Sequence, residues 1–95
     1  MVNTGCMKDI LRYVKGKAGM TVKDDVANYK HIVLLDMFSD IKKETLYSDE
    51  DFAYAYLKCH DYGYLKDDIV IKGTSLDMKR SSVYDITPTG EMFCK

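Results

Sequence analysis

The stretch that decides the fold spans residues 48–95, SDEDFAYAYLKCHDYGYLKDDIVIKGTSLDMKRSSVYDITPTGEMFCK. It begins with a helical segment that runs from Ser48 to Gly63. Ser48 is a good N-cap, and the three acids after it lie in the first turn, where the helix dipole favours negative charge. Gly63 is suited to the left-handed conformation that commonly ends a helix. The sequence therefore predicts a helix with two well-defined ends.

Two β-branched runs follow this helix. Ile69 and Ile71 lie on one face of a predicted strand, and Tyr84 and Ile86 lie on one face of a second. Residues 73–80 between them are too many for a tight turn, so they predict a protruding loop, or wing. A short C-terminal helix follows, with a Thr cap and a Pro at its first position, where a missing N–H costs nothing. This order predicts an α+β fold, a winged helix-turn-helix with a two-stranded wing hairpin.

The first half of the chain predicts further helices. Apolar residues recur every three or four positions over about residues 6–15, which indicates a first helix that the glycines after it end. Thr21 is the predicted N-cap of a second helix, whose apolar period continues to Ile41 for about five turns. Three N-terminal helices therefore precede the wing, the first being an addition to the winged-helix plan. We expect a single domain over residues 1–95.

The composition fits one small intracellular domain. The chain has 95 residues, of which 46% are hydrophobic, enough for one modest core. Its net charge is −1, so no overall positive field draws it to phosphate, and a nucleic-acid site would have to be a local patch. Three cysteines without paired spacing fit neither a disulfide framework nor a zinc site, which predicts reduced thiols in a cytoplasmic protein. No apolar run approaches the length of a membrane span, and we expect no membrane partner.

Catalysis is not expected. His31 and His60 lie on different predicted helices, and no catalytic motif surrounds either of them. Cys59 is predicted to point inward and has no evident base nearby. The Gly-Lys-Ala-Gly run at residues 16–19 lacks the spacing of a phosphate-binding loop. We therefore predict a protein that is not an enzyme, with no catalytic residue, no metal ligand and no cofactor.

Two parts of the chain resemble a known family. They are residues 48–65, with the pattern Ser48 to Phe52, Ala55, Tyr56, Cys59 and Gly63 to Leu65, and the closing run Tyr84 to Glu91. Both are similar to the YjcQ-like family of small bacterial and phage winged-helix proteins, and the "I-T-P-x-G-E" at residues 86–91 is the most specific piece. The resemblance implies a winged-helix fold and a phage or prophage context, and it implies no established activity. This chain differs from the family in its additional N-terminal helix.

The outer face of the helix before the wing separates two classes of partner. Carboxylates at its start would repel phosphate, and it offers few of the side chains that contact base edges, so it is a poor surface for DNA. Its apolar and aromatic residues are instead typical of the centre of a protein interface. The residues predicted to bind a protein are Tyr54, Leu57, Asp61 and Tyr62. Alternatively, the N-terminal helix covers Tyr54 and Leu57, which would make both of them core.

The wing is the better candidate for contact with nucleic acid. A loop that carries Lys and Arg can reach a phosphate or the minor groove, although charged hairpin loops are often only solvated. The residues predicted to bind nucleic acid are Lys58, Lys72, Lys79 and Arg80. A separate basic cluster follows helical spacing on the first helix, at Lys8, Arg12, Lys15 and Lys17.

Two functions of different class remain. The first is a DNA-binding regulator of transcription from a phage or mobile element, favoured by what folds of this shape usually do. The second is a protein-interaction module, such as a phage-encoded protein that binds and inhibits a host enzyme or nucleoprotein. A homodimer stays open.

Overall fold

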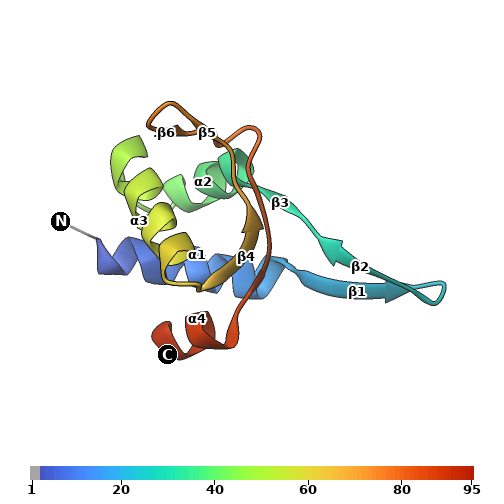
Figure 1. The fold of residues 1–95 in the computed structure, drawn as a ribbon. Coiled ribbons are helices and arrows are strands. Elements are labelled where there is room, and N and C mark those ends of the chain that lie inside the picture. Colours follow the sequence, from blue (N-terminus) through green and yellow to red (C-terminus); the bar gives the residue numbers. More distant parts are fainter. Residues whose placement is uncertain (1–2) are drawn as a thin grey trace.

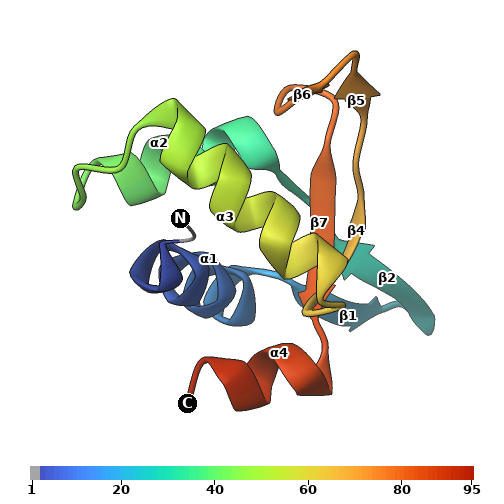
Figure 2. The ribbon, with the colours of Figure 1, turned by 60° about the vertical axis from the view of Figure 1, so that its left-hand side comes forward.

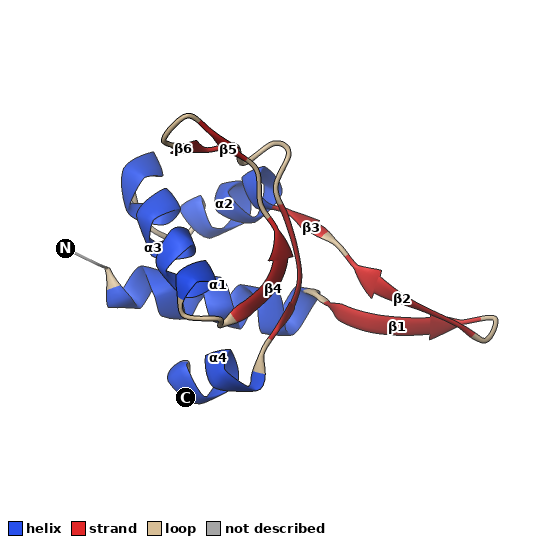
Figure 3. Cartoon of the chain, in the orientation of Figure 1, coloured by secondary structure: helices blue, strands red, loops and turns tan. Residues whose placement is uncertain are grey.

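The chain combines helices with small antiparallel sheets, which confirms the predicted α+β class (Figure 1). The computed structural model describes residues 3–95, apart from the side chains of residues 20–23 and 29. Within that range the elements in chain order are α1 (Thr4–Lys17), β1 (Gly19–Lys23), β2 (Val26–Lys30), β3 (Ile32–Val33), α2 (Leu34–Lys42), α3 (Asp49–Asp61), β4 (Leu65–Asp68), β5 (Ile71–Lys72), β6 (Ser75–Leu76), β7 (Ser82–Ile86) and α4 (Pro88–Phe93). The helices lie on one side, and the β1–β2 hairpin projects from the other (Figure 3).

The largest sheet has three strands in the order β3-β7-β4. Its central strand, β7, pairs antiparallel with β3 through Ile32 and Val83, and with β4 through Leu65 and Ile86. The predicted second strand is present as β7, but the predicted first strand is wrong: Ile69 lies in no strand, Ile71 belongs to β5, which pairs with β6, and the partner of β7 is β4. β7 is the last strand in the sequence, and it pairs with one strand from each half of the chain. The three-stranded sheet therefore cannot form without it.

The second helix, predicted to begin after Thr21, is wrong over residues 22–33, which form the end of β1, a turn, β2 and β3. β1 and β2 form an antiparallel hairpin whose turn residues, Asp24 and Asp25, have φ angles of 52° and 62°. Positive φ at both central residues is the requirement of a type I′ turn, and Asp tolerates that conformation better than most residues. Thr21, the predicted N-cap, lies on β1, and its side chain is outside the described part of the chain.

The second helix, α2, begins only at Leu34, and backbone carbonyls cap it in place of a side chain. The amides of Leu34 and Leu35 donate to the carbonyls of Ser81 (3.0 Å) and Met78 (3.1 Å). These acceptors satisfy two of the N–H groups that every helix start leaves free. The expectation of three N-terminal helices is corrected accordingly, since a hairpin and a strand separate α1 from α2.

Helices α1 and α3 pack side by side, and α4 lies on the other side of α1 (Figure 2). The apolar face of α1 is fully buried, so this helix is part of the core. The predicted inward face of α3 is also confirmed, and its four residues are fully buried: Phe52, Ala55, Tyr56 and Cys59. The ends of α3 agree with the sequence as well, because the Ser48 hydroxyl accepts the Asp51 amide (3.1 Å) and Gly63 follows the helix with a φ of 73°.

The closing run at residues 86–91 has a structural role at nearly every position. The Thr87 hydroxyl accepts the Gly90 amide (3.1 Å) and donates to the Gly63 carbonyl (2.7 Å), so it caps α4 and joins it to the end of α3. A Cβ atom at Gly90 would overlap the Tyr64 carbonyl oxygen and lie 2.9 Å from Ile86 Cγ1. The closing run therefore maintains the fold of this chain.

We expect Gly90→Ala to lower the free energy of unfolding by about 1–3 kcal/mol, because backbone atoms block the added methyl group. Gly16→Ala is the matched control: nothing lies within 4 Å of a Cβ there, and alanine is the better helix former. Urea denaturation measures both variants. Equal stability of the two would contradict the close contact at Gly90.

Stability should also fall at alkaline pH. Burial raises the pKa values of the Cys6 and Cys59 thiols to about 12, and burial together with the hydrogen bond to Asp67 raises the pKa of Tyr56 far above its usual range. The unfolded chain then loses these protons first, so the free energy of unfolding declines as the pH rises above about 9, by up to about 1.4 kcal/mol per pH unit for each group. Urea titrations between pH 8 and 11 test this. Tyr56→Phe should flatten the decline above pH 10, and a stability independent of pH would contradict it.

Candidate functional site

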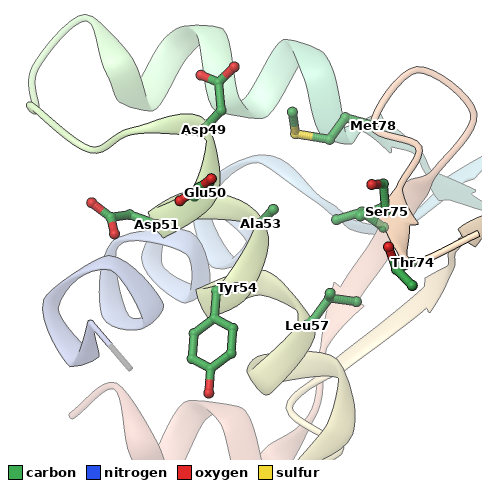
Figure 4. A pocket seen from close by; sticks show the side chains of 10 residues that line it. Asp49, Glu50, Asp51, Ala53, Tyr54, Leu57, Thr74, Ser75 and Met78 are labelled. Atoms are coloured by element: carbon green, nitrogen blue, oxygen red, sulfur yellow. The ribbon is translucent and has the colours of Figure 1, made fainter. Parts of the chain in front are cut away.

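An open groove of about 680 Å³ lies between α3 and the segment that connects β4 to β7, residues 69–81 (Figure 4). We call this segment the β4–β7 connection and the hollow the α3 groove. One side of the groove comes from the first turns of α3, and the other comes from the connection. The residues that line it are Asp49, Glu50, Asp51, Ala53, Tyr54, Leu57, Thr74, Ser75, Leu76 and Met78.

The middle of the groove is apolar. Leu57 points from α3 toward Thr74 and Ser75, and Met78 lies across from the start of the helix (Figure 4). Leu57 and Met78 are half-buried, as are Ala53 and Leu76 on the two sides. Half-buried apolar side chains that face each other across an open space leave apolar surface for a partner to cover.

One end of the groove is acidic. Asp49, Glu50 and Asp51 are all exposed there, and the residues that line the groove include no Lys or Arg. Lys42 lies beside this end, with its Nζ 3.9 Å from Asp49 Oδ1, and both side chains are largely exposed. An exposed pair at that distance contributes little and leaves most of the negative charge uncompensated. The dipole of α3 stabilises these carboxylates without removing their charge.

The structure decides whether the N-terminal helix covers the outer face of α3. α1 packs against the inward face, where the Cys59 thiol contacts the Met7 carbonyl at 3.9 Å. Tyr54 is 46% exposed, so it is not a core residue. Leu57 is half-buried and lines the open groove, so it is not a core residue either. The alternative in which both residues are core is therefore wrong.

The other two residues predicted to bind protein lie elsewhere. Asp61 and Tyr62 are at the C-terminal end of α3, outside the residues that line the groove. The Tyr62 ring is 5.5 Å from that of Tyr64, which in turn stacks on Phe93 of α4 at 4.8 Å. Tyr54 and Leu57 thus line the α3 groove, Tyr62 belongs to a separate aromatic cluster, and Asp61 is exposed at the end of α3.

The residues predicted to bind nucleic acid lie on two elements. Lys72, Lys79 and Arg80 are exposed on the β4–β7 connection, and Arg80 Nε is 3.9 Å from Asp77 Oδ2. Lys58 is on α3, where its Nζ lies 5.6 Å from the centre of the Tyr54 ring. None of the four lines the α3 groove. The basic residues of α1 are separate again: Lys8 lies over Phe93, and Arg12 pairs with Asp9.

Sequence reasoning missed the groove because its two sides come from distant parts of the chain. The three acids were explained by helix capping, which the Ser48 cap and their first-turn position support. Their neighbours across the groove, Leu76 and Met78, carry no local signal of a site. Only the tertiary contact between α3 and the connection turns a capped helix start into one end of a groove.

Both histidines and the buried Tyr56 have structural partners outside the groove. The Tyr56 hydroxyl donates to Asp67 Oδ2 (2.6 Å), and His60 Nδ1 lies 2.8 Å from Asp67 Oδ1. His31 packs edge-on against the Tyr84 ring with centroids 4.4 Å apart. Among the residues that the structure describes, no group of three His, Cys, Asp or Glu side chains is arranged to hold a metal ion.

Comparisons of the chain with protein-family models, with curated proteins and with solved structures find no match. None of the helices in residues 3–95 has both the length and the apolar content needed to cross a membrane. The proposed function therefore rests on the geometry of the site.

We expect Ser81→Ala to loosen the β4–β7 connection. Ser81 is fully buried, and its hydroxyl donates to the Asp77 carbonyl (2.6 Å) and accepts the Val70 amide (2.9 Å). Loss of both bonds should cost about 1–3 kcal/mol, because buried polar groups are left unpaired. Hydrogen exchange should accelerate at the Val70 amide. Ser75→Ala, at an exposed position, is the control, and an unchanged Val70 exchange rate in Ser81→Ala would refute this role.

Proposed function

We propose that this chain is a non-enzymatic winged-helix protein that binds another protein through α3 and the β4–β7 connection. The order of elements supports the fold: α1, β3, α2, α3 and β4 are followed by a long connection that returns as β7, and the sheet order is β3-β7-β4. In a winged helix α2 and α3 form the helix-turn-helix, α3 is the presented helix and the connection is the wing. On this proposal α1 is the first helix of the plan, and the β1–β2 hairpin is the added element.

The lining of the α3 groove favours a protein over DNA as the partner. Its lining joins three carboxylates to an apolar middle and includes no cation. A duplex that approached this face would bring phosphates toward Asp49, Glu50 and Asp51. A protein surface gains instead, because it can cover Leu57, Leu76 and Met78 and supply the missing positive charge.

The resemblance of residues 48–95 to the YjcQ-like family supports an origin in a phage or mobile element. A protein of that origin acts in the cytoplasm of its host, so the partner that we propose is a host enzyme or nucleoprotein. The chain would act on it by occupying a surface, without chemistry of its own.

DNA binding in transcription regulation is the second candidate. Lys72, Lys79 and Arg80 favour it, because all three are exposed on the connection that would be the wing. Lys58 on α3 would be the fourth contact. In this alternative the wing, and not the face of α3, would touch the phosphate backbone.

An electrophoretic shift assay separates the two candidates. We expect no retardation of mixed-sequence duplex by micromolar protein at low salt, a condition in which nonspecific DNA binding is strong. Retardation that Lys72→Gln/Lys79→Gln/Arg80→Gln abolishes would overturn the proposal in favour of DNA. The matched control is Arg12→Gln/Lys15→Gln/Lys17→Gln, which removes the same number of positive charges from α1.

Site-specific photo-crosslinking tests the protein-binding face directly. A photoreactive amino acid in place of Leu57 should capture a protein in lysate of the source organism. The same group in place of Thr89, exposed on α4, should not capture it. The captured protein is then purified and should bind the parent chain but not a folded Leu57→Lys variant. Equal binding to both would remove the α3 groove as the site.

A further inference from the structure

We propose that the α3 groove receives a cationic amphipathic helix, presented by the partner protein. This inference rests on the proposed function and adds the chemistry of the partner segment. It follows from the charge of the groove, the arrangement of its apolar residues and the short strands beside it.

Charge complementarity is the first argument. The acidic end of the groove presents three exposed carboxylates from one turn of helix, and its lining contains no cation. The partner segment must bring positive charge to this end, because an acidic or neutral segment would leave the carboxylates partly desolvated and unpaired. Lys or Arg side chains on the segment meet that requirement.

The apolar residues are the second argument. Ala53 and Leu57 are spaced by four on α3, so they lie on one face of the helix, and Leu76 and Met78 line the groove from the connection. A volume of about 680 Å³ accepts several side chains from a partner. A segment that fills the middle of the groove and also reaches its acidic end therefore carries an apolar stripe beside its cations.

The third argument separates a helix from an extended strand. A strand that binds by adding to a sheet needs a row of unpaired N–H and C=O groups. The strands beside the groove, β5 and β6, have only two residues each, so the edge that either of them presents is too short for an added strand. The groove thus offers side chains in place of a backbone edge. An amphipathic helix, with apolar residues at positions i, i+3, i+4 and i+7, suits such a surface.

A defined peptide tests the inference. The probe is a fluorescent 15-residue peptide of Leu and Lys, blocked at both ends, with Leu at helical spacing so that one face is apolar. A second peptide has the same composition in an order that spreads Leu around the helix. Fluorescence anisotropy with the full chain measures both affinities. We expect the amphipathic peptide to bind at least tenfold more tightly than its rearranged form.

Variants of the full chain locate the binding. Glu50→Gln/Asp51→Asn should weaken the amphipathic peptide about three- to tenfold, the effect of losing two exposed charge pairs. Leu57→Lys should abolish binding. Asp24→Asn/Asp25→Asn removes the same charge at the distant hairpin turn, where Asn also tolerates positive φ, and should change affinity less than twofold. Circular dichroism and thermal melting establish that each variant is folded.

Several outcomes would overturn the inference. They are equal affinity for the two peptides, equal weakening by the hairpin variant, or unchanged binding to a folded Leu57→Lys chain. Self-association of the parent chain that Leu57→Lys abolishes would assign the groove to a second copy. If the amphipathic peptide does not bind but a photoreactive group at position 57 still captures a partner protein, the proposed cationic helix is wrong and the proposed function stands. A DNA shift would instead overturn the proposed function.

Discussion

The arrangement of α3 against the sheet depends on one nearly buried carboxylate. The side chain of Asp67 on β4 is 4% exposed, and it accepts the Tyr56 hydroxyl and contacts His60 Nδ1. A buried carboxylate without donors costs several kcal/mol, and both groups that contact it come from α3, one turn apart. This requirement fixes the rotation of the helix about its own axis. With Tyr56 held inward, Ala53 and Leu57 face the connection, so the α3 groove exists because Asp67 is satisfied.

Backbone hydrogen bonds position the other side of the groove, the β4–β7 connection. The Asp77 amide donates to the Val70 carbonyl (2.9 Å), and the carbonyls of Met78 and Ser81 accept the first amides of α2. The connection therefore cannot move away without uncapping α2. Because both sides of the groove are positioned before a partner arrives, binding need not pay for ordering a loop. The same bonds stabilise a long connection that contains only one pair of two-residue strands.

Sequence reasoning succeeded where a signal and its consequence are close in the chain. Each correct prediction depends on residues only a few positions apart in the sequence. Examples are the apolar face of α1, the N-cap at Ser48, the helix end at Gly63 and the N-cap at Thr87. It failed where the partner is distant. Val33 is a poor N-cap, and the start of α2 is stabilised by carbonyls near the end of the chain. The Asp24-Asp25 turn lacks the glycine that usually marks a type I′ hairpin, so the run was assigned to a helix. The groove could not be predicted for the same reason, because its two sides are distant in the sequence.

The acids at the start of α3 illustrate how capping and recognition can share residues. The N-terminal end of a helix carries partial positive charge, which makes three neighbouring carboxylates tolerable there. In the proposed complex the cations of the incoming helix would meet this end. A helix tolerates Lys and Arg best in its last turn, for the same reason that it tolerates acids in its first. The incoming helix should therefore lie antiparallel to α3, with its C-terminal turn beside Asp49, Glu50 and Asp51, so that both dipoles and both sets of charges are satisfied together.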